Sequence, residues 1–323
     1  MAVTRRSALL SPLALAAAAR IAPASAQAGF PSQTVRIIVP YSPGGASDIA
    51  ARLLAEKLTP LWKQSVVVEN RTGANGIVGS DAVAKAAPDG TTLGFVSVNH
   101  AVNAALYTTP FDTLRDFSVL SVIYSVPLVL VAAPGFPAST VQELMAMVKA
   151  RPGQVSFANT GGAVHLAAEM FAHQTGAAML NVPYRGSTAA HPDLIGGRVD
   201  VMFDTLPAVL GHVQSGKLKA LATTAAQRLP ILPELPTVAE GGLPGFEAAT
   251  WGAIIGPAGL PAPIAAKISA DAVAQLQQDS IKERMAALGA TPVGTTPEEA
   301  QAFVRAEVAK WQAVVTQAGI EKQ

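Results

Sequence analysis

Two stretches of this chain repeat one order of elements: an extended apolar run, a glycine loop and an apolar pattern with helical spacing. The first spans residues 35–58 with its loop at 43–45, and the second spans residues 155–174 with its loop at 159–162. Short loops that join strands to helices in alternation favour a parallel sheet covered by helices on both faces. This alternation constrains the fold more than any single motif, and it indicates an α/β protein.

The loop of the first stretch leads directly into a predicted helix. Ser47 or Asp48 is expected to cap this helix through its side-chain oxygen. Free backbone N–H groups and the positive end of the helix dipole then point toward the loop, which suits an anion without any charged side chain. Taken alone, the stretch is equally well explained as an ordinary turn. Its repetition favours two anion-binding units that face each other.

The βα alternation falls into two blocks, and a chain of 323 residues has room for two domains. Domain 1 is expected to be discontinuous, with residues 29–128 and 247–323, because the C-terminal helical patterns are interpreted as packing on the first block. Domain 2 is expected at residues 129–246. Ligands of such sheets bind beyond the carboxyl ends of the strands, which is where both glycine loops lie.

Residues 1–28 have the pattern of a secretory signal, with Arg5 and Arg6 before an apolar stretch and small residues at its end. Cleavage is expected after Ala26 or Ala28. The paired arginines are compatible with the twin-arginine route as well as with general secretion. The apolar stretch is short for a membrane span, and the chain has no cysteine for disulfide or thiolate chemistry. We therefore expect a periplasmic protein.

Several classes of chemistry lack their motifs in this sequence. The net charge of +1 gives no support for nucleic-acid binding, and the five histidines do not have the close spacing of metal ligands. Residues 211–217 match the start of a phosphate-binding loop, but Leu218 stands where that loop requires serine or threonine. There is also no G-x-S-x-G nucleophile motif. The absence of a catalytic constellation favours a binding protein over an enzyme.

The sequence resembles the Bug family of periplasmic solute-binding proteins, the receptor components of tripartite tricarboxylate transporters. The resemblance extends in order over the mature chain and is carried by VPYSPGGASDIAARLLAEKL, VENRTGANGIVGSDAVAKAAPDGTTL, HLAAEMF, NVPYRG, DLIGGRVDVMFD and LPTVAEGGLPGFEAATWGAIIGPAGLP. It implies two α/β domains, each with a mostly parallel sheet, that are joined by crossing strands and close on a ligand like a flytrap. It also implies that one strand–turn–helix unit from each domain holds a ligand carboxylate, largely through backbone amides and ordered water.

The resemblance also implies which residues form the site. The two units match residues 41–48 and 158–165, which we call the first unit and the second unit. Ligand contacts are expected in the first unit from Tyr41, Ser42, Gly44, Gly45 and Asp48, and in the second from Asn159, Thr160, Gly161, Gly162 and His165. Five more residues are expected to line the cleft and to vary the choice of ligand: Ser97, Asn99, Tyr184, Arg185 and Asp204. The chain departs from the family pattern at His191, which bears on the ligand and not on the fold.

These observations predict an exported receptor that binds a small carboxylate, either an organic acid or an acidic amino acid. The receptor is expected to be a monomer without cofactor or metal, and to meet membrane transporter subunits transiently. Two alternatives remain open. One is a periplasmic enzyme that acts on an organic acid with Asp204 or His165 as acid or base. The other is an orphan receptor that serves signalling.

Overall fold

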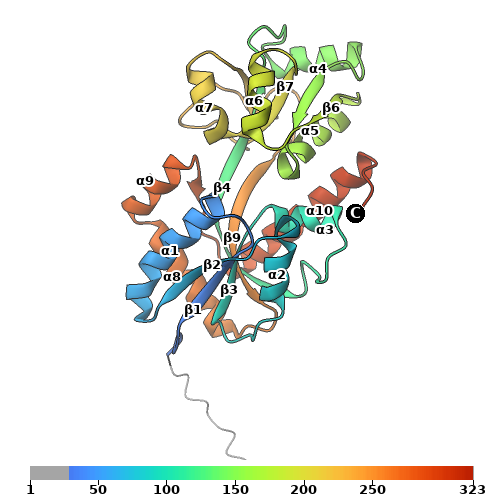
Figure 1. Cartoon of the computed structure of the whole chain (residues 1–323). Helices are drawn as coiled ribbons and strands as arrows, with labels where there is room; N and C mark the ends of the chain where they lie inside the picture. The colour runs from blue at the N-terminus through green and yellow to red at the C-terminus, as the bar shows by residue number, and fades with distance from the viewer. Residues whose placement is uncertain (1–28, 323) are drawn as a thin grey trace, which may run out of the picture.

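The computed structural model describes residues 29–322, so the predicted signal segment of residues 1–28 lies outside the described part of the chain. Figure 1 shows two lobes, one above the other, with strands β4 (Phe117–Ala132) and β9 (Ala249–Pro257) running between them. The lower lobe, domain 1, contains both ends of the described chain, and the upper lobe, domain 2, contains its middle. The two-domain arrangement implied by the family resemblance is therefore confirmed.

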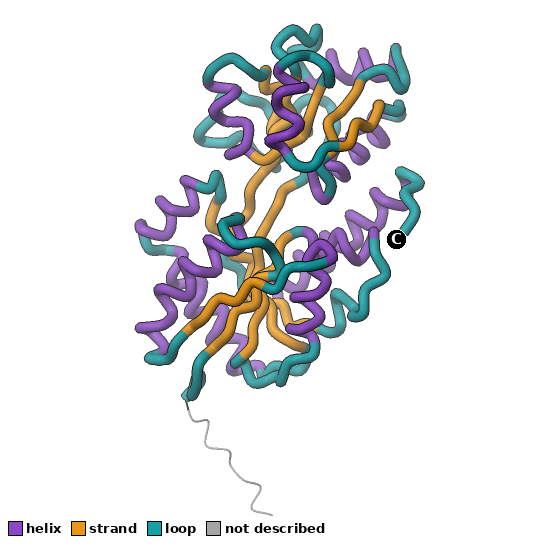
Figure 2. The backbone as a smooth tube through the Cα atoms, viewed as in Figure 1, coloured by secondary structure: helices purple, strands orange, loops and turns teal. Residues whose placement is uncertain are grey.

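Domain 1 is built on a sheet with the strand order β2-β1-β3-β9-β4 and a short β10 beside β4. Its further strands are β1 (Val35–Val39), β2 (Val66–Asn70), β3 (Thr92–Ser97) and β10 (Thr291–Pro292). Helices lie on both sides of this sheet (Figure 2). They are α1 (Ala46–Trp62), the 3₁₀ turn η1 (Ala74–Gly76), α2 (Ile77–Ala84), α3 (Asn99–Leu106), α8 (Ala262–Leu276), α9 (Asp279–Ala287) and α10 (Pro297–Gln317).

Domain 2 continues from the far half of β4 in the order β4-β7-β5-β6, with β8 also paired to β4. Its strands are β5 (Ser156–Asn159), β6 (Leu180–Pro183), β7 (Val201–Thr205) and β8 (Lys219–Thr223). Its helices are α4 (Val141–Ala150), α5 (Gly162–Thr175), α6 (Ser187–Ile195) and α7 (Leu206–Gln214).

The sheets are mixed, which corrects the expectation that each would be mostly parallel. Strands that belong to βα units pair in parallel, as β1 does with β2 and β3, and as β5 does with β6 and β7. The crossing strands introduce the antiparallel pairs, because β9 runs back toward domain 1 beside β3 and β4. A return strand must run opposite to the strand that left the domain, and a βα pattern does not reveal it.

The crossing strands position the two domains. β4 pairs with β9 from Phe117 to Pro127 and then with β7 from Leu128 onward, so one continuous strand belongs to both sheets. The indole N–H of Trp251 in β9 donates to Oε2 of Glu307 at 2.8 Å, which ties this strand to α10. The predicted boundaries at residues 128/129 and 246/247 remain predictions, since the chain passes without interruption through the first of them.

Candidate ligand-binding cleft

A cavity of about 640 Å³ lies between the two domains, and both contribute to its wall. From domain 1 it is lined by Tyr41, Gly45, Ala46, Ser47, Asn75, Ser97, Val98, Asn99, Tyr107, Tyr124 and Thr250. From domain 2 it is lined by Thr160, Gly161, Gly162, Ala163, Val164, Ser187, Asp204 and Thr205. Its volume lies in the range of small-molecule sites.

Five helices begin at this cavity. The N-cap residues of α1, α3, α5, α6 and α7 are Gly45, Val98, Gly161, Gly186 and Thr205, and none of them caps its helix with a side-chain hydrogen bond. By contrast, α4 and α10 begin away from the cavity and are capped by threonine side chains. The first turn of a helix leaves backbone N–H groups without intrahelical partners. The cavity wall therefore carries many backbone donors and the positive ends of several helix dipoles.

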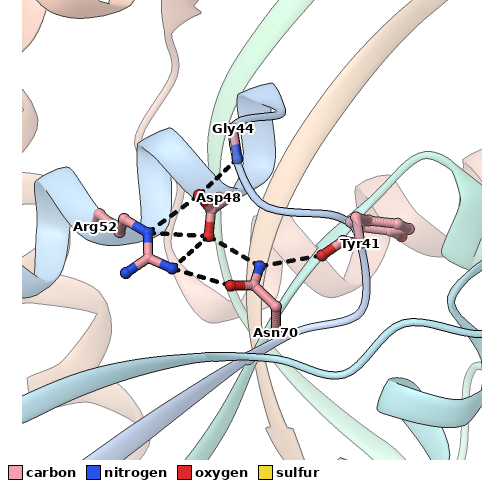
Figure 3. A network of polar contacts seen from close by, with 5 residues as sticks. All are labelled: Tyr41, Gly44, Asp48, Arg52 and Asn70. Carbon is pink, nitrogen blue, oxygen red and sulfur yellow. Dashed lines mark hydrogen bonds and ion pairs between the residues drawn. The ribbon is translucent and has the colours of Figure 1, made fainter.

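The first unit is held in place by a polar network around Asp48, which is 3% exposed (Figure 3). Its carboxylate accepts from the backbone N–H of Gly44 at 2.9 Å, from Nδ2 of Asn70 at 2.9 Å and from Nε of Arg52 at 3.1 Å. Burial alone would raise the pKa of Asp48, but these hydrogen bonds and the charge of Arg52 hold it below its ordinary value. Asp48 thus fixes the loop. It is not among the residues that line the cavity, and its ligand contact remains a prediction.

The expectation that Ser47 or Asp48 caps α1 is wrong, because the N-cap is Gly45 in an extended conformation with no side-chain cap. Both polar residues lie inside the first turn. Ser47 turns inward to Tyr124, with 3.2 Å between the two hydroxyl oxygens, and Asp48 reaches back to Gly44. A serine or aspartate near a glycine loop is compatible with several cap positions, and here the packing of the loop selected the glycine.

Two tyrosines, Tyr41 and Tyr124, belong to the lining that domain 1 contributes. The Tyr41 hydroxyl accepts from the backbone N–H of Ser97 at 3.0 Å, and burial raises the pKa of Tyr41 despite this hydrogen bond. Burial also raises the pKa of Tyr124, so both phenols are neutral at ordinary pH. Neutral hydroxyls can donate to an anion and accept from an ammonium or hydroxyl group.

Three asparagine side chains of domain 1 are joined by hydrogen bonds, and one of them lies against the second unit. Nδ2 of Asn99 donates to Oδ1 of Asn75 at 3.1 Å, and Nδ2 of Asn75 donates to Oδ1 of Asn103 at 2.7 Å. Oδ1 of Asn99 lies so close to Gly162 that a Cβ added there would be 3.1 Å away. The first helical turn of α5 therefore meets domain 1 at Asn99.

The second unit has a lighter scaffold. The backbone N–H of Gly161 donates to Oδ1 of Asn159 at 2.7 Å, and Nδ2 of Asn159 donates to Oδ1 of Asn181 at 3.0 Å. Gly161 and Gly162 have φ angles of 84° and 55°, which favour glycine. Asn159 and His165 lie outside the cavity lining, and Nε2 of His165 contacts Oε1 of Glu169 at 3.0 Å. Their predicted ligand contacts remain predictions.

The predicted site residues divide into those that line the cavity and those that do not. Eight line the cavity: Tyr41, Gly45, Ser97, Asn99, Thr160, Gly161, Gly162 and Asp204. Ser42 and Gly44 are exposed beside it, Arg185 is exposed, and the hydroxyl of Tyr184 donates to Oδ2 of Asp193 at 2.9 Å. These four are not brought to the lining, and their contacts also remain predictions.

Sequence reasoning assigned no ligand contact to several polar residues of the wall: Ser47, Asn75, Tyr107, Tyr124, Ser187, Thr205 and Thr250. A signal existed for Asn75 and Ser187, which follow strands in glycine-containing loops and so lie at the carboxyl ends of the sheets. Tyr124 and Thr250 belong to the crossing strands, where only the pairing register brings them to the cavity. No local sequence pattern predicts the register between these two strands.

Two domains, crossing strands and a polar cavity between them define a solute-binding protein of the flytrap type. Residues 50–320 match the model of the tripartite tricarboxylate transporter family receptor, so the chain belongs to this family. It is 40% identical to protein BugT of Bordetella pertussis over 324 residues, which cover 99% of each chain. The predicted membership of the Bug family is thereby confirmed.

The solved structures that share this fold include two with a bound carboxylate. The chain is 35% identical to R. palustris Rpa4515 with adipate, with a TM-score of 0.76 and coverage of 91% of this chain and 100% of the other. It is 30% identical to MatC from Rhodopseudomonas palustris with bound malate, with a TM-score of 0.72 and coverage of 88% and 100%. The family consists of solute-binding receptors, so the chain is a receptor and not an enzyme.

Within residues 29–322, no group of three or more His, Cys, Asp or Glu side chains is arranged to hold a metal ion. In the same part of the chain, no helix has the length and apolar character needed to cross a membrane.

Proposed function

We propose that this protein binds a small carboxylate in the cavity between its domains and presents it to a tripartite transporter. The observation that carries this proposal is the meeting of five helix N-termini, without side-chain caps, at one interdomain cavity. Lysine, arginine and histidine are absent from the described residues that line it. Backbone amides and neutral hydroxyls therefore act as the donors for the anion.

The strength of such a site is sufficient for a receptor. One helix N-terminus contributes about 0.3–1 kcal/mol toward an exposed anion and up to about 2 kcal/mol when it is partly buried. A hydrogen bond to a charged group contributes about 1.5–3 kcal/mol. Because α1 and α5 belong to different domains, a ligand can contact the N-termini of both helices only when the domains are close together. The ligand then favours the closed arrangement through differential affinity.

The solved relatives support the same ligand class. Adipate and malate, the ligands of the two structures described above, are both carboxylates of small size. We assign the ligand contacts of this chain to the predicted residues that line the cavity, among them Gly45 at the N-cap of α1 and Gly161 and Gly162 at the start of α5. We add Ser47 in the first turn of α1, which also lines the cavity.

The proposed setting is the periplasm. The basic and apolar pattern of residues 1–28 supports export, and Arg5-Arg6 is compatible with both the twin-arginine route and general secretion. We further propose a monomer that contacts transporter subunits transiently. Fractionation of cells, with the paired arginines replaced by lysines, tests the route, and light scattering after gel filtration tests the oligomeric state.

Titration of mono-, di- and tricarboxylates against the melting temperature tests the function. At least one acid is expected to raise the melting temperature through binding to the native state. In Gly45→Asp, a carboxylate on the cap of α1 competes for the same amides, so the rise is expected to disappear while stability is kept or gains a few tenths of a kcal/mol. Gly135→Asp is the control, because Gly135 lies outside the cavity lining with open space around it. If no acid stabilises the unaltered protein, the proposed function is wrong.

A further inference from the structure

Asp204 is the one charged side chain among the described residues that line the cavity. It lies near the end of β7, directly before α7, and is 2% exposed. The rest of the wall consists of hydroxyl, amide, apolar and glycine residues. A carboxylate in the wall of a carboxylate-binding cavity repels the ligand carboxylate, because like charges at close range interact unfavourably. Its presence is therefore best explained by a contact with another group of the ligand.

The contacts of Asp204 leave it able to accept further hydrogen bonds. Oδ1 accepts from the backbone N–H of Thr205 at 2.7 Å, and Oδ2 lies 2.9 Å from Nε2 of His191, which is 8% exposed. A carboxylate offers about four acceptor positions, so these two contacts leave about two. His191 is packed in turn against the ring of His212, with 5.0 Å between the ring centroids. The imidazole thus fixes the orientation of the carboxylate from behind.

We propose that Asp204 selects ligands that carry a hydrogen-bond donor, a hydroxyl or an ammonium group, in addition to the carboxylate held by the helix ends. His191 is the positioning residue that aims Asp204 at this donor. The inference rests on the proposed function and narrows its ligand class to hydroxy and amino carboxylates. A ligand without a donor would cover Asp204 and leave its remaining acceptor positions unpaired, which is costly for a buried carboxylate.

The charge of the cavity supports the same ligand class. Of the five helix ends at the cavity, we assign the ligand carboxylate to those of α1, with Gly45 and Ser47, and of α5, with Gly161 and Gly162. Asp204 lies on the wall that domain 2 contributes through β7 and α7. A ligand with an anionic end and a donor matches both parts of the wall. A second unprotonated carboxylate beside Asp204 would place two negative charges together.

Matched ligand pairs test the proposal on the unaltered protein. Isothermal titration is carried out with succinate, L-malate and L-aspartate, and with glutarate and L-glutamate, so that the members of each set differ by one donor group. The donor-bearing member is expected to bind about 10- to 100-fold more tightly in at least one set. Equal or tighter binding of the donor-free acids overturns this inference and leaves the proposed function intact. Failure of every carboxylate to bind overturns both.

Variants locate the preference at Asp204. Asp204→Asn is expected to abolish or reverse the preference, because its amide can donate to a second carboxylate. His191→Phe is expected to reduce the ratio of affinities within a set, and His191→Gln, which keeps an N–H donor, is expected to restore most of it. A merely structural role for His191 would lower all affinities together and leave the ratio unchanged, which would contradict its assignment.

Asp193→Asn is the matched control, since Asp193 lies on the same helix as His191 and bonds to Tyr184 and Arg198 outside the cavity lining. Its ratio is expected to equal that of the unaltered protein. If Asp204→Asn does not fold, the two His191 variants decide the question. An unchanged ratio in a folded Asp204→Asn protein overturns the inference.

Discussion

The first and second units make the same turn from strand to helix by different means. In the first, the buried carboxylate of Asp48 joins the loop to Arg52 and Asn70, and Asn70 also donates to the backbone oxygen of Tyr41 at 3.0 Å. In the second, the conformation depends on Gly161 and Gly162. Its hydrogen bonds are exposed and neutral, from the backbone N–H of Gly161 to Asn159 and from Asn159 to Asn181. Domain 1 therefore offers a fixed half of the site, and domain 2 offers a half that is held more weakly.

Because of this difference, changes in the first unit are expected to affect mainly stability, and changes in the second unit mainly ligand binding. A change in the scaffold of the first unit removes buried, charged hydrogen bonds and is expected to lower the free energy of unfolding. A change in the second unit removes little that is buried and is expected to act mainly on ligand affinity. The predictions below follow from this contrast.

The largest expected effect is on the pH dependence of stability, and it comes from domain 1, the fixed half of the site. His100 is 2% exposed beside the cavity residue Asn99, and neither of its ring nitrogens has a hydrogen-bond partner among residues 29–322. Burial lowers the pKa of His100 to about 4 from 6.5. Between these values the unfolded chain binds more protons than the native protein, so stability falls as the pH drops from about 6.5 to 4. The loss attributable to His100 is about 3 kcal/mol.

Urea unfolding between pH 4 and 7 measures this loss. His100→Leu is expected to flatten the dependence and to leave stability at pH 7 unchanged or slightly higher, because a buried polar ring without partners is replaced by an apolar side chain. His173→Gln, at an exposed position of α5 in domain 2, is expected to keep the full dependence. A dependence that survives in His100→Leu would show that another group causes it.

The next effect concerns the network of the first unit. Asp48→Ala leaves the Gly44 N–H and the Asn70 amide without their shared acceptor and is expected to lower the free energy of unfolding by about 2–3 kcal/mol. Arg52 is half exposed, so its lost partner adds little. The control is Glu56→Gln on the same helix, whose ion pair with Arg284 is exposed on both sides. Chemical denaturation should show a clearly larger loss of unfolding free energy for Asp48→Ala than for Glu56→Gln. Equal losses in the two variants would contradict a fixed first unit.

The α/β class and the two βα blocks were accessible from the sequence because hydrophobic periodicity and glycine loops are local signals, whereas the flytrap arrangement was implied by the family resemblance. The residues added by the crossing strands were not, since Thr250 faces Val126 through a register set between segments far apart in the chain. The contact between His191 and Asp204 is of the same kind, because it joins a helix to the end of a strand. The wrong cap at Ser47 or Asp48 has a local cause, because Gly45, the true N-cap, lies within three residues of two side chains that are also suited to capping.

A smaller effect is expected at the second unit, where binding should change more than stability. Gly162→Ala puts a Cβ at a φ of 55° and at 3.1 Å from Oδ1 of Asn99. We expect about a tenfold loss of carboxylate affinity and a loss of about 1 kcal/mol in stability. Gly176→Ala, at the other end of α5, has a similar φ of 71° with open space around it. It should show the same loss of stability with unchanged affinity, so equal affinities for the two variants would refute the interdomain contact.

The smallest effect is expected for Asn159→Ala, which removes the side-chain acceptor of the Gly161 N–H. Because this hydrogen bond is exposed and neutral, the loss of stability should stay below about 1 kcal/mol. Affinity should fall a few-fold, since Gly161 lines the cavity and gains freedom. Asn181→Ala removes the neighbouring contact at 3.0 Å but keeps the bond to Gly161, so its affinity should be unchanged. A loss of stability in Asn159→Ala as large as in Asp48→Ala would mean that side chains fix both units equally, and the contrast between the two domains would then fail.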